Sequence, residues 1–190
     1  ADVQLWAAQR TNESAQIALM NPGGLRADMT YASSANEGDG VLTYREAAIV
    51  QPFANTLVTT QLTGAQLAQV LEEQWQPAAA SRPFLRLGVS AGFTYTYDPN
   101  AEPGSRIVEM QLDGAPIAED ATYTVVVNSF LASGGDNFAT LAEGAATQDT
   151  GQSDLTAMVD YLAEFGTVSP DYAQRAVGVD WVSDPATEYA

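Results

Sequence analysis

The stretch Asn128–Phe138 combines an aromatic ring, adjacent glycines and a carboxylate, directly after the β-branched and aromatic run Thr122–Val127. Phe130 offers a flat face on which a nucleobase can stack, and Asp136 can accept hydrogen bonds from ribose hydroxyls. Glycine permits the sharp bend that would bring the ring and the carboxylate to one ligand. The pattern indicates a nucleoside-binding loop. The alternative is a strand end followed by a tight turn, with Phe130 in the core.

A second segment, Asn21–Arg26, joins a proline and two glycines to an arginine. The proline stiffens the turn, Gly24 and its glycine neighbour let backbone amides approach a ligand, and Arg26 supplies a planar cationic fork. A glycine turn with an arginine suits a phosphate or another anion. The alternative is a surface turn in which Arg26 pairs with Asp28 or with another acid.

A third segment, Gln51–Asn55, places an aromatic ring just after a proline. Phe53 lies between a helical turn and a strand, where an aromatic can face a cleft. Asn55 offers both a donor and an acceptor, as the edge of a nucleobase requires. The alternative is a packed loop aromatic followed by a turn asparagine.

Composition excludes several classes of function. The chain has 190 residues and a net charge of −17, from 24 acids against 7 bases, all of them arginine. Such a surface repels nucleic acids and anionic membranes, so neither is an expected partner. The absence of histidine and cysteine excludes a Ser-His-Asp triad, a cysteine nucleophile and histidine or thiolate metal sites within this chain. We therefore expect no catalytic residue, no metal ligand and no cofactor in the chain itself, and no membrane span.

The remaining pattern predicts strands and helices mixed through one compact unit, an α/β fold of the α+β type with mixed sheets covered by helices. The periodicity predicts strands over 16–20, 56–62, 93–97, 107–112 and 122–127. Capping boxes at Thr43–Glu46 and Thr63–Gln66 predict two helix starts, the second helix carrying Leu67, Val70, Leu71 and Trp75 on one face. Further helices are predicted over 3–9 and 155–165, with loops over 31–40 and 77–83 and a polar tail over 180–190.

Taken together, the segments Asn-x-Gly-Gly-Leu-Arg, Pro-Phe-x-Asn and Asn-x-Phe-Leu-Ala-x-Gly-Gly-Asp-x-Phe resemble, in this order, the C-terminal domain of the 5′-nucleotidase family. Gln61–Leu67 looks like that family's strand-to-helix step, and Ser153–Phe165 looks like its last helix. The resemblance extends over 1–179, which we take as the domain, with 180–190 as its tail. It implies a layered fold of mixed sheets covered by helices.

The resemblance also implies roles for single residues. In that family a preceding metallophosphatase domain holds two divalent metal ions, and the domain seen here binds the nucleoside and presents its phosphate to them. Carried over by motif, the rings at 53 and 130 would clamp the base, and the amide at 55 would meet the base edge. The carboxylate at 136 would accept the ribose hydroxyls, and Gly135 would let the backbone approach the sugar. Arg26 and Asn21 would meet the phosphate.

The chain departs from the family pattern in two ways. The metal-binding motifs require histidine, so the partner metallophosphatase domain and its two divalent metal ions would lie outside this chain. A further phosphate-side arginine of the family should fall upstream of Ala1, because Arg10 lies too close to Asn21 to replace it. We interpret the chain as a fragment that begins inside the first helix of the domain.

These observations predict the nucleotide-recognition domain of a secreted, periplasmic or cell-surface bacterial phosphohydrolase that removes phosphate from nucleotides. Two alternatives stay open. The parent could act on 2′,3′-cyclic nucleotides or nucleotide sugars, or the domain could be a non-catalytic surface binding module. The base preference, the metals, the oligomeric state and the mode of surface attachment do not follow from the sequence.

Overall fold

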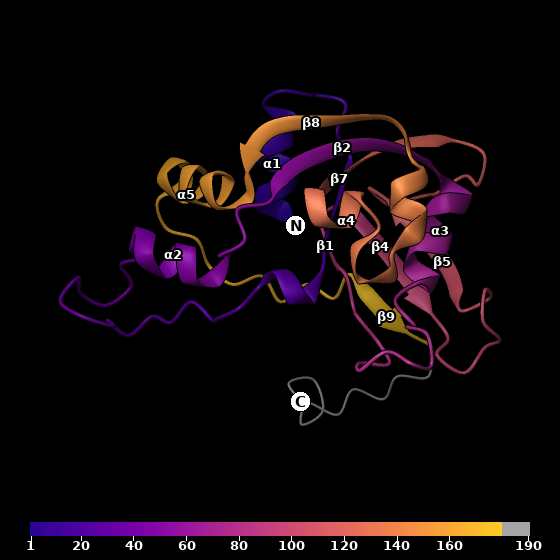
Figure 1. The fold of residues 1–190 in the computed structure, drawn as a ribbon, viewed down its shortest axis with the longest axis horizontal. Helices are drawn as coiled ribbons and strands as arrows, with labels where there is room; N and C mark the ends of the chain where they lie inside the picture. Colours follow the sequence, from indigo (N-terminus) through magenta and orange to yellow (C-terminus); the bar gives the residue numbers. More distant parts are fainter. Residues whose placement is uncertain (180–190) are drawn as a thin grey trace.

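The computed structural model describes residues 1–179, and its larger sheet contains five strands in the order β3-β1-β7-β2-β8 (Figure 1). The central pair, β1 and β7, is parallel, whereas β3 on β1, β2 on β7 and β8 on β2 are antiparallel. The strands span Ile17–Met20 (β1), Thr56–Thr63 (β2), Gly88–Val89 (β3), Thr122–Asn128 (β7) and Ala145–Ser153 (β8).

The smaller sheet has the order β6-β5-β4-β9, with β9 parallel to β4 and the other pairs antiparallel. Its strands span Phe93–Tyr97 (β4), Ile107–Leu112 (β5), Ala115–Pro116 (β6) and Ala176–Gly178 (β9). The aromatic residues of β4 are buried and alternate with more exposed threonines, as the period of a half-buried strand requires.

Five α-helices lie among the described residues: α1 (Asp2–Gln9), α2 (Tyr44–Val50), α3 (Gly64–Glu72), α4 (Ser129–Ala132) and α5 (Asp154–Phe165). Three short 3₁₀ turns complete them: η1 (Pro22–Gly24), η2 (Gly135–Asn137) and η3 (Ala139–Glu143). Both predicted capping boxes are formed, by Thr43 with Glu46 and by Thr63 with Gln66. Each box satisfies amides that the first turn of a helix leaves free.

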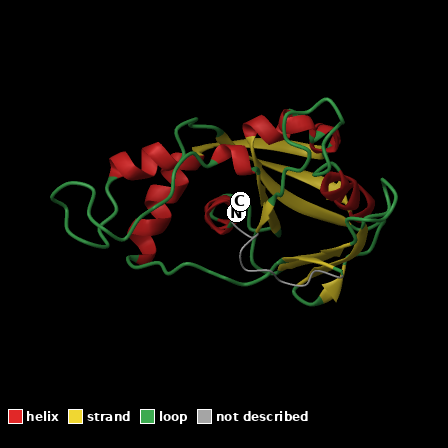
Figure 2. Cartoon of the chain, turned by 90° about the horizontal axis from the view of Figure 1, so that it is seen from below, coloured by secondary structure: helices red, strands yellow, loops and turns green. Residues whose placement is uncertain are grey.

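The larger sheet is covered on both faces (Figures 1 and 2). Ile17 and Val125 point to one side and share a core with α3 and the smaller sheet. Their neighbours Ala18 and Val126 point to the other side and pack beside α1 and α5. A strand buried on both faces has a continuous apolar sequence, as Ile17–Met20 and the valines 125–127 of β7 show. The predicted fold class, mixed sheets covered by helices, is confirmed.

Two local features differ from the expectation. Helix α3 ends at Glu72, and Trp75 instead forms an isolated bridge with Phe84, at a ring-centroid distance of 4.9 Å. The bridge joins the two ends of the predicted loop over 77–83. Strand β8 went unpredicted because its residues are mostly polar and exposed, so its pairing with β2 decides its conformation. The predicted tail lies outside the described residues.

Candidate functional site

The strand order gathers the three sequence segments at one edge of the larger sheet. Because β1 and β7 are parallel neighbours, Asn21–Arg26 and Asn128–Phe138 leave the sheet side by side. Because β2 is antiparallel to β7, it begins where β7 ends, with Leu57 opposite Asn128. Gln51–Asn55 therefore enters the sheet at the same edge. A hydrogen bond from the backbone nitrogen of Thr56 to Ser129 Oγ (3.2 Å) joins the segments.

A cavity of about 350 Å³ opens between these segments. This volume lies within the usual range for small-molecule sites. The lining residues include seven of the eight predicted site residues, Gly135 being the exception. They are Asn21, Gly23, Gly24, Arg26, Phe53, Asn55, Arg82, Phe130 and Asp136.

Two exposed aromatic rings border the cavity. The side chains of Phe53 and Phe130 are 55% and 42% exposed, although both are large and apolar. Phe130 is held at the start of α4, whose first turn is capped by Asn128 Oδ1 accepting from the nitrogen of Leu131 (2.9 Å). Phe130 is therefore a cavity residue and not a core residue. Exposed rings on a concave surface are suited to stacking on a flat ligand.

The carboxylate at the cavity is fixed by a buried amide chain. Asn128 Nδ2 donates to Asn21 Oδ1 (3.0 Å), and Asn21 Nδ2 donates to Asp136 Oδ2 (2.8 Å). Both asparagines are buried, so their amides are costly to leave without partners. Asn21 thus lines the cavity, and its side-chain amide orients Asp136. The second carboxylate oxygen of Asp136 takes no hydrogen bond from the residues that the structure describes.

Glycine is required where the loop turns. Gly134 and Asp136 adopt left-handed backbone conformations, with φ of 81° and 55°. Gly135 lies behind the cavity, where an added Cβ would stand 2.5 Å from the Phe130 ring. At Gly24, an added Cβ would stand 2.4 Å from Met20 Cε. Both glycines therefore leave room for neighbouring side chains that shape the site.

Arg26 reaches the cavity without an acidic partner. Its backbone nitrogen donates to the carbonyl of Val50 (2.9 Å), which ties the arginine to the end of α2 just before Phe53. Its guanidinium carbon lies 5.9 Å from the Phe53 ring centroid, within cation–π range. Within residues 1–179 it forms no ion pair with Asp28 or any other acid. Its cationic fork is free for an anionic ligand.

Asn55 is anchored through its backbone to the start of α5. Its carbonyl accepts from the nitrogen of Asp154 (2.8 Å). Burial raises the pKa of the Asp154 carboxyl above its usual range, against hydrogen bonds from Leu155 and Asn55 that lower it. Asn55 itself lines the cavity next to Phe53, with Ala54 between them in a left-handed conformation, φ 51°. This turn places the aromatic face and the amide at the same cavity.

The sequence segments did not include Arg82, which also lines the cavity. It lies on the loop between α3 and β3, and β3 begins opposite the end of β1, at Met20 and Gly88. The loop is docked on the Asp136 turn, because Gln76 Nε2 donates to the carbonyl of Asp136 (3.0 Å) and Gln76 Oε1 accepts from Asn137 (2.8 Å). The sequence feature that could have indicated Arg82 is the scarcity of basic residues, because an arginine is unusual in a chain with a net charge of −17.

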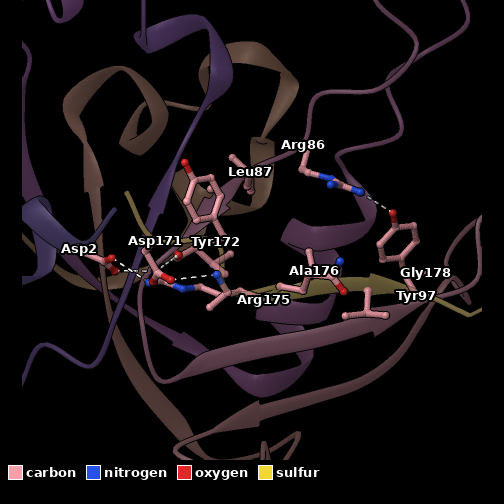
Figure 3. A pocket seen from close by; sticks show the side chains of 14 residues that line it. Asp2, Arg86, Leu87, Tyr97, Asp171, Tyr172, Arg175, Ala176 and Gly178 are labelled. Atoms are coloured by element: carbon pink, nitrogen blue, oxygen red, sulfur yellow. Dashed lines mark hydrogen bonds and ion pairs between the residues drawn. The ribbon is translucent and has the colours of Figure 1, made fainter. Parts of the chain in front are cut away.

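A different cavity, of about 450 Å³, lies between β3 and β9 (Figure 3). Its central arginine, Arg175, is held by Asp2 and Asp171 and donates to the carbonyl of Val89 (2.8 Å). Arg86 there donates to the Tyr97 hydroxyl (2.6 Å). With its donors engaged in this way, Arg175 joins the C-terminal segment to α1 and β3 rather than offering itself to an anion.

Within the described residues 1–179, no side-chain group fits a divalent metal centre. The chain contains no histidine or cysteine, and within residues 1–179 no group of three or more acidic side chains could hold a metal ion. Among the helices of this described part, none combines the length and apolar character needed to cross a membrane. The site is therefore one of stacking rings, two arginines, an oriented carboxylate and an amide, which can bind and orient a ligand.

Comparison with known proteins identifies the family of this chain. The profile of the family described as "5'-nucleotidase, C-terminal domain" matches residues 1–143. The chain is 33% identical over 170 residues to the trifunctional nucleotide phosphoesterase protein YfkN of Bacillus subtilis, covering 85% of this chain and 11% of that protein. It is 30% identical over 138 residues to the cell wall protein Lmo0130 of Listeria monocytogenes, covering 72% and 17%.

Among solved structures, the 5′-nucleotidase precursor of Thermus thermophilus superposes with a TM-score of 0.77 at 32% identity, over 95% of this chain and 35% of that one. The fold is thus the one found in the C-terminal domains of 5′-nucleotidases. The chain belongs to the 5′-nucleotidase family, as its C-terminal domain. It spans between 11% and 35% of the length of these relatives.

Proposed function

We propose that this domain is the nucleotide-recognition part of a metal-dependent phosphohydrolase that removes phosphate from nucleotides. The observation that supports this most is the meeting of the three segments at one cavity, bordered by Phe53 and Phe130. A nucleobase between these rings would gain about 1–3 kcal/mol from stacking. The Asn55 amide would meet the base edge, Asp136 would accept the ribose hydroxyls, and Arg26 would meet the phosphate.

Hydrolysis is assigned to a metallophosphatase domain outside this chain. Two divalent ions in such a domain would activate water and stabilise the displaced oxygens. This chain contains no histidine, and its described residues 1–179 contain no acidic group that fits such ions. Its residues would bind the nucleoside, orient it and hold the phosphate toward the other domain. A location outside the cytoplasm, either secreted or on the cell surface, is supported by the likeness to the Listeria cell wall protein.

Calorimetric titration of the chain with adenosine and AMP tests the recognition role. We expect weak binding of both, reduced roughly tenfold by Phe53→Ala or Phe130→Ala, since each removes a stacking face. Tyr172→Ala is the matched control, because Tyr172 is 79% exposed and lies outside this cavity. Equal adenosine affinity in Phe130→Ala and the unaltered chain would contradict the stacking role.

Turnover measurements test whether hydrolysis depends on a domain outside this chain. The purified chain should release no phosphate from AMP with added Mg²⁺, Mn²⁺ or Zn²⁺, because it has no histidine and no acidic cluster within residues 1–179 that could hold a metal pair. The full-length parent should hydrolyse nucleotides, and a panel of 5′-nucleotides, 2′,3′-cyclic nucleotides and nucleotide sugars would define its phosphoester class. Phosphate release by the pure chain, or an inactive parent, would contradict the proposal.

A further inference from the structure

We propose that Arg82 is a second anion-recognition residue of this site, and that it admits nucleotides carrying phosphate on the 2′ or 3′ oxygen of the ribose. The inference rests on the proposed nucleoside site, because it takes the ribose to lie against Asp136. It adds a group that none of the three sequence segments contains. It also assigns a specificity to that group.

The first support is the position of the Arg82 side chain. Its Nη2 lies 3.5 Å from the point that a Gly23 Cβ would occupy. The Nδ2 of Asn21 lies at the same distance from that point, and Asp136 Oδ2 lies at 3.6 Å. Arg82 therefore stands on the Asn21–Asp136 side of the cavity. Arg26, by contrast, stands at the Phe53 ring.

The second support is that Arg82 forms no ion pair with an acidic side chain within residues 1–179. Arg106 and Arg175 form ion pairs, with Glu72 and with Asp2 and Asp171. Arg82 forms none within residues 1–179, even though Asp136 is close by and the chain as a whole carries a charge of −17. Its guanidinium fork is thus available, and a planar fork matches the oxygens of a phosphate.

The third support is that the loop is held in place. Gln76 anchors it to the backbone of Asp136 and to the side chain of Asn137. Trp75 and Phe84 stand at the two ends of the loop, and their rings pack against each other. The backbone that carries Arg82 is therefore fixed near the Asp136 turn.

Charge then decides the ligand class. A ribose phosphate beside Asp136 would be repelled by the carboxylate, because like charges at close range disfavour each other. A guanidinium on the same side offsets that repulsion. A ligand with free ribose hydroxyls needs only the carboxylate. Arg82 thus matters for a nucleotide with phosphate on those hydroxyls, whereas Arg26 serves a phosphate elsewhere on the ligand.

The test compares four ligands on the same chain by calorimetry: adenosine, 5′-AMP, 3′-AMP and 2′,3′-cyclic AMP. Arg82→Gln should weaken 3′-AMP and 2′,3′-cyclic AMP at least tenfold, while adenosine and 5′-AMP change less than threefold. Arg45→Gln is the matched control, since Arg45 is exposed, lies outside the cavity and loses the same charge. Arg82→Lys should restore part of the lost affinity.

The outcomes separate this inference from the proposed function. Adenosine binding that depends on Phe130, together with 3′-AMP affinity that Arg82→Gln leaves unchanged, would overturn the role of Arg82 alone. An equal loss for 5′-AMP and 3′-AMP would also overturn it, because Arg82 would then serve the 5′-phosphate. Failure of the chain to bind any of the four ligands would overturn both. Equal thermal midpoints for the variants and the unaltered chain would show that each comparison is made on a folded domain.

Discussion

Asn21 and Asp136 are 115 positions apart in the chain, yet Asn21 Nδ2 donates to Asp136 Oδ2 at 2.8 Å. Asn21 is buried and also accepts from Asn128 at 3.0 Å, so its amide joins the end of β7 to the carboxylate at the cavity. The hydrogen bond holds one carboxylate oxygen. The other oxygen is left to accept from a ligand. The orientation of the site is thus set by a residue whose own amide lies mostly out of solvent.

Replacing Asn21 by alanine should weaken adenosine and AMP binding by a similar factor, because the change releases Asp136 from its orientation. If Asn21 instead contacted the phosphate, AMP alone would be affected, and calorimetry with both ligands distinguishes the two. The variant should also lose about 1–3 kcal/mol of unfolding free energy, since Asn128 keeps a buried amide without its partner. Asn100→Ala, at an exposed turn, should change neither quantity.

Replacing Gly135 by alanine should reduce adenosine affinity about tenfold without any change in the cavity's polar groups. The new methyl would stand 2.5 Å from the Phe130 ring and displace it from its place beside the ligand. Gly88→Ala is the control, because a Cβ there meets its nearest atom at 3.7 Å, an ordinary contact. Unchanged adenosine affinity in Gly135→Ala would mean that the position of the Phe130 ring does not matter for binding.

Replacing Thr43 by alanine should destabilise the domain by about 1 kcal/mol, because it removes the side-chain cap of α2. Thr43→Ser keeps the hydroxyl and should retain most of the stability. Since the last turn of α2 holds the backbone of Arg26 through Val50, AMP affinity should fall with the alanine variant. Urea unfolding and AMP titration measure the two effects, and equal stability of the alanine and serine variants would refute the capping role.

Alkaline pH should destabilise the domain through Tyr95. Burial raises the pKa of its hydroxyl to about 12. The folded state therefore holds this proton more tightly than the unfolded chain, and its contribution is complete below about pH 10. That contribution, about 3 kcal/mol, is lost as the pH rises from about 10 to about 12.

Tyr95→Phe should remove this part of the pH dependence. Urea unfolding at a series of alkaline pH values measures it, and Tyr31→Phe is the control because Tyr31 is 77% exposed. If the unaltered chain and Tyr95→Phe lost stability in parallel above pH 10, Tyr95 would not be the group responsible.

Local features of this fold could be predicted from the sequence. The capping boxes at Thr43 and Thr63 involve partners three residues away, so they are visible in the chain itself. The alternation in Phe93–Tyr97 likewise reflects a period that every half-buried strand shares. Conversely, Trp75 fits the apolar face of α3 by spacing but lies outside the helix, where it forms a bridge with Phe84 that helical spacing does not reveal.

The sequence by itself determined the chemical types at the site: two rings, an arginine, an amide, a carboxylate and the glycines that bend the loops. It also excluded a histidine or cysteine metal centre in this chain. Only the tertiary structure decided which of these groups meet. The parallel pairing of β1 with β7 and the antiparallel approach of β2 bring three distant segments to one edge. The start of β3 brings Arg82 there as well. Helix caps and the alternation of buried residues depend on neighbours a few positions away. Strand order, in contrast, depends on the packing of the whole chain. The cavity forms only when the strands are in that order.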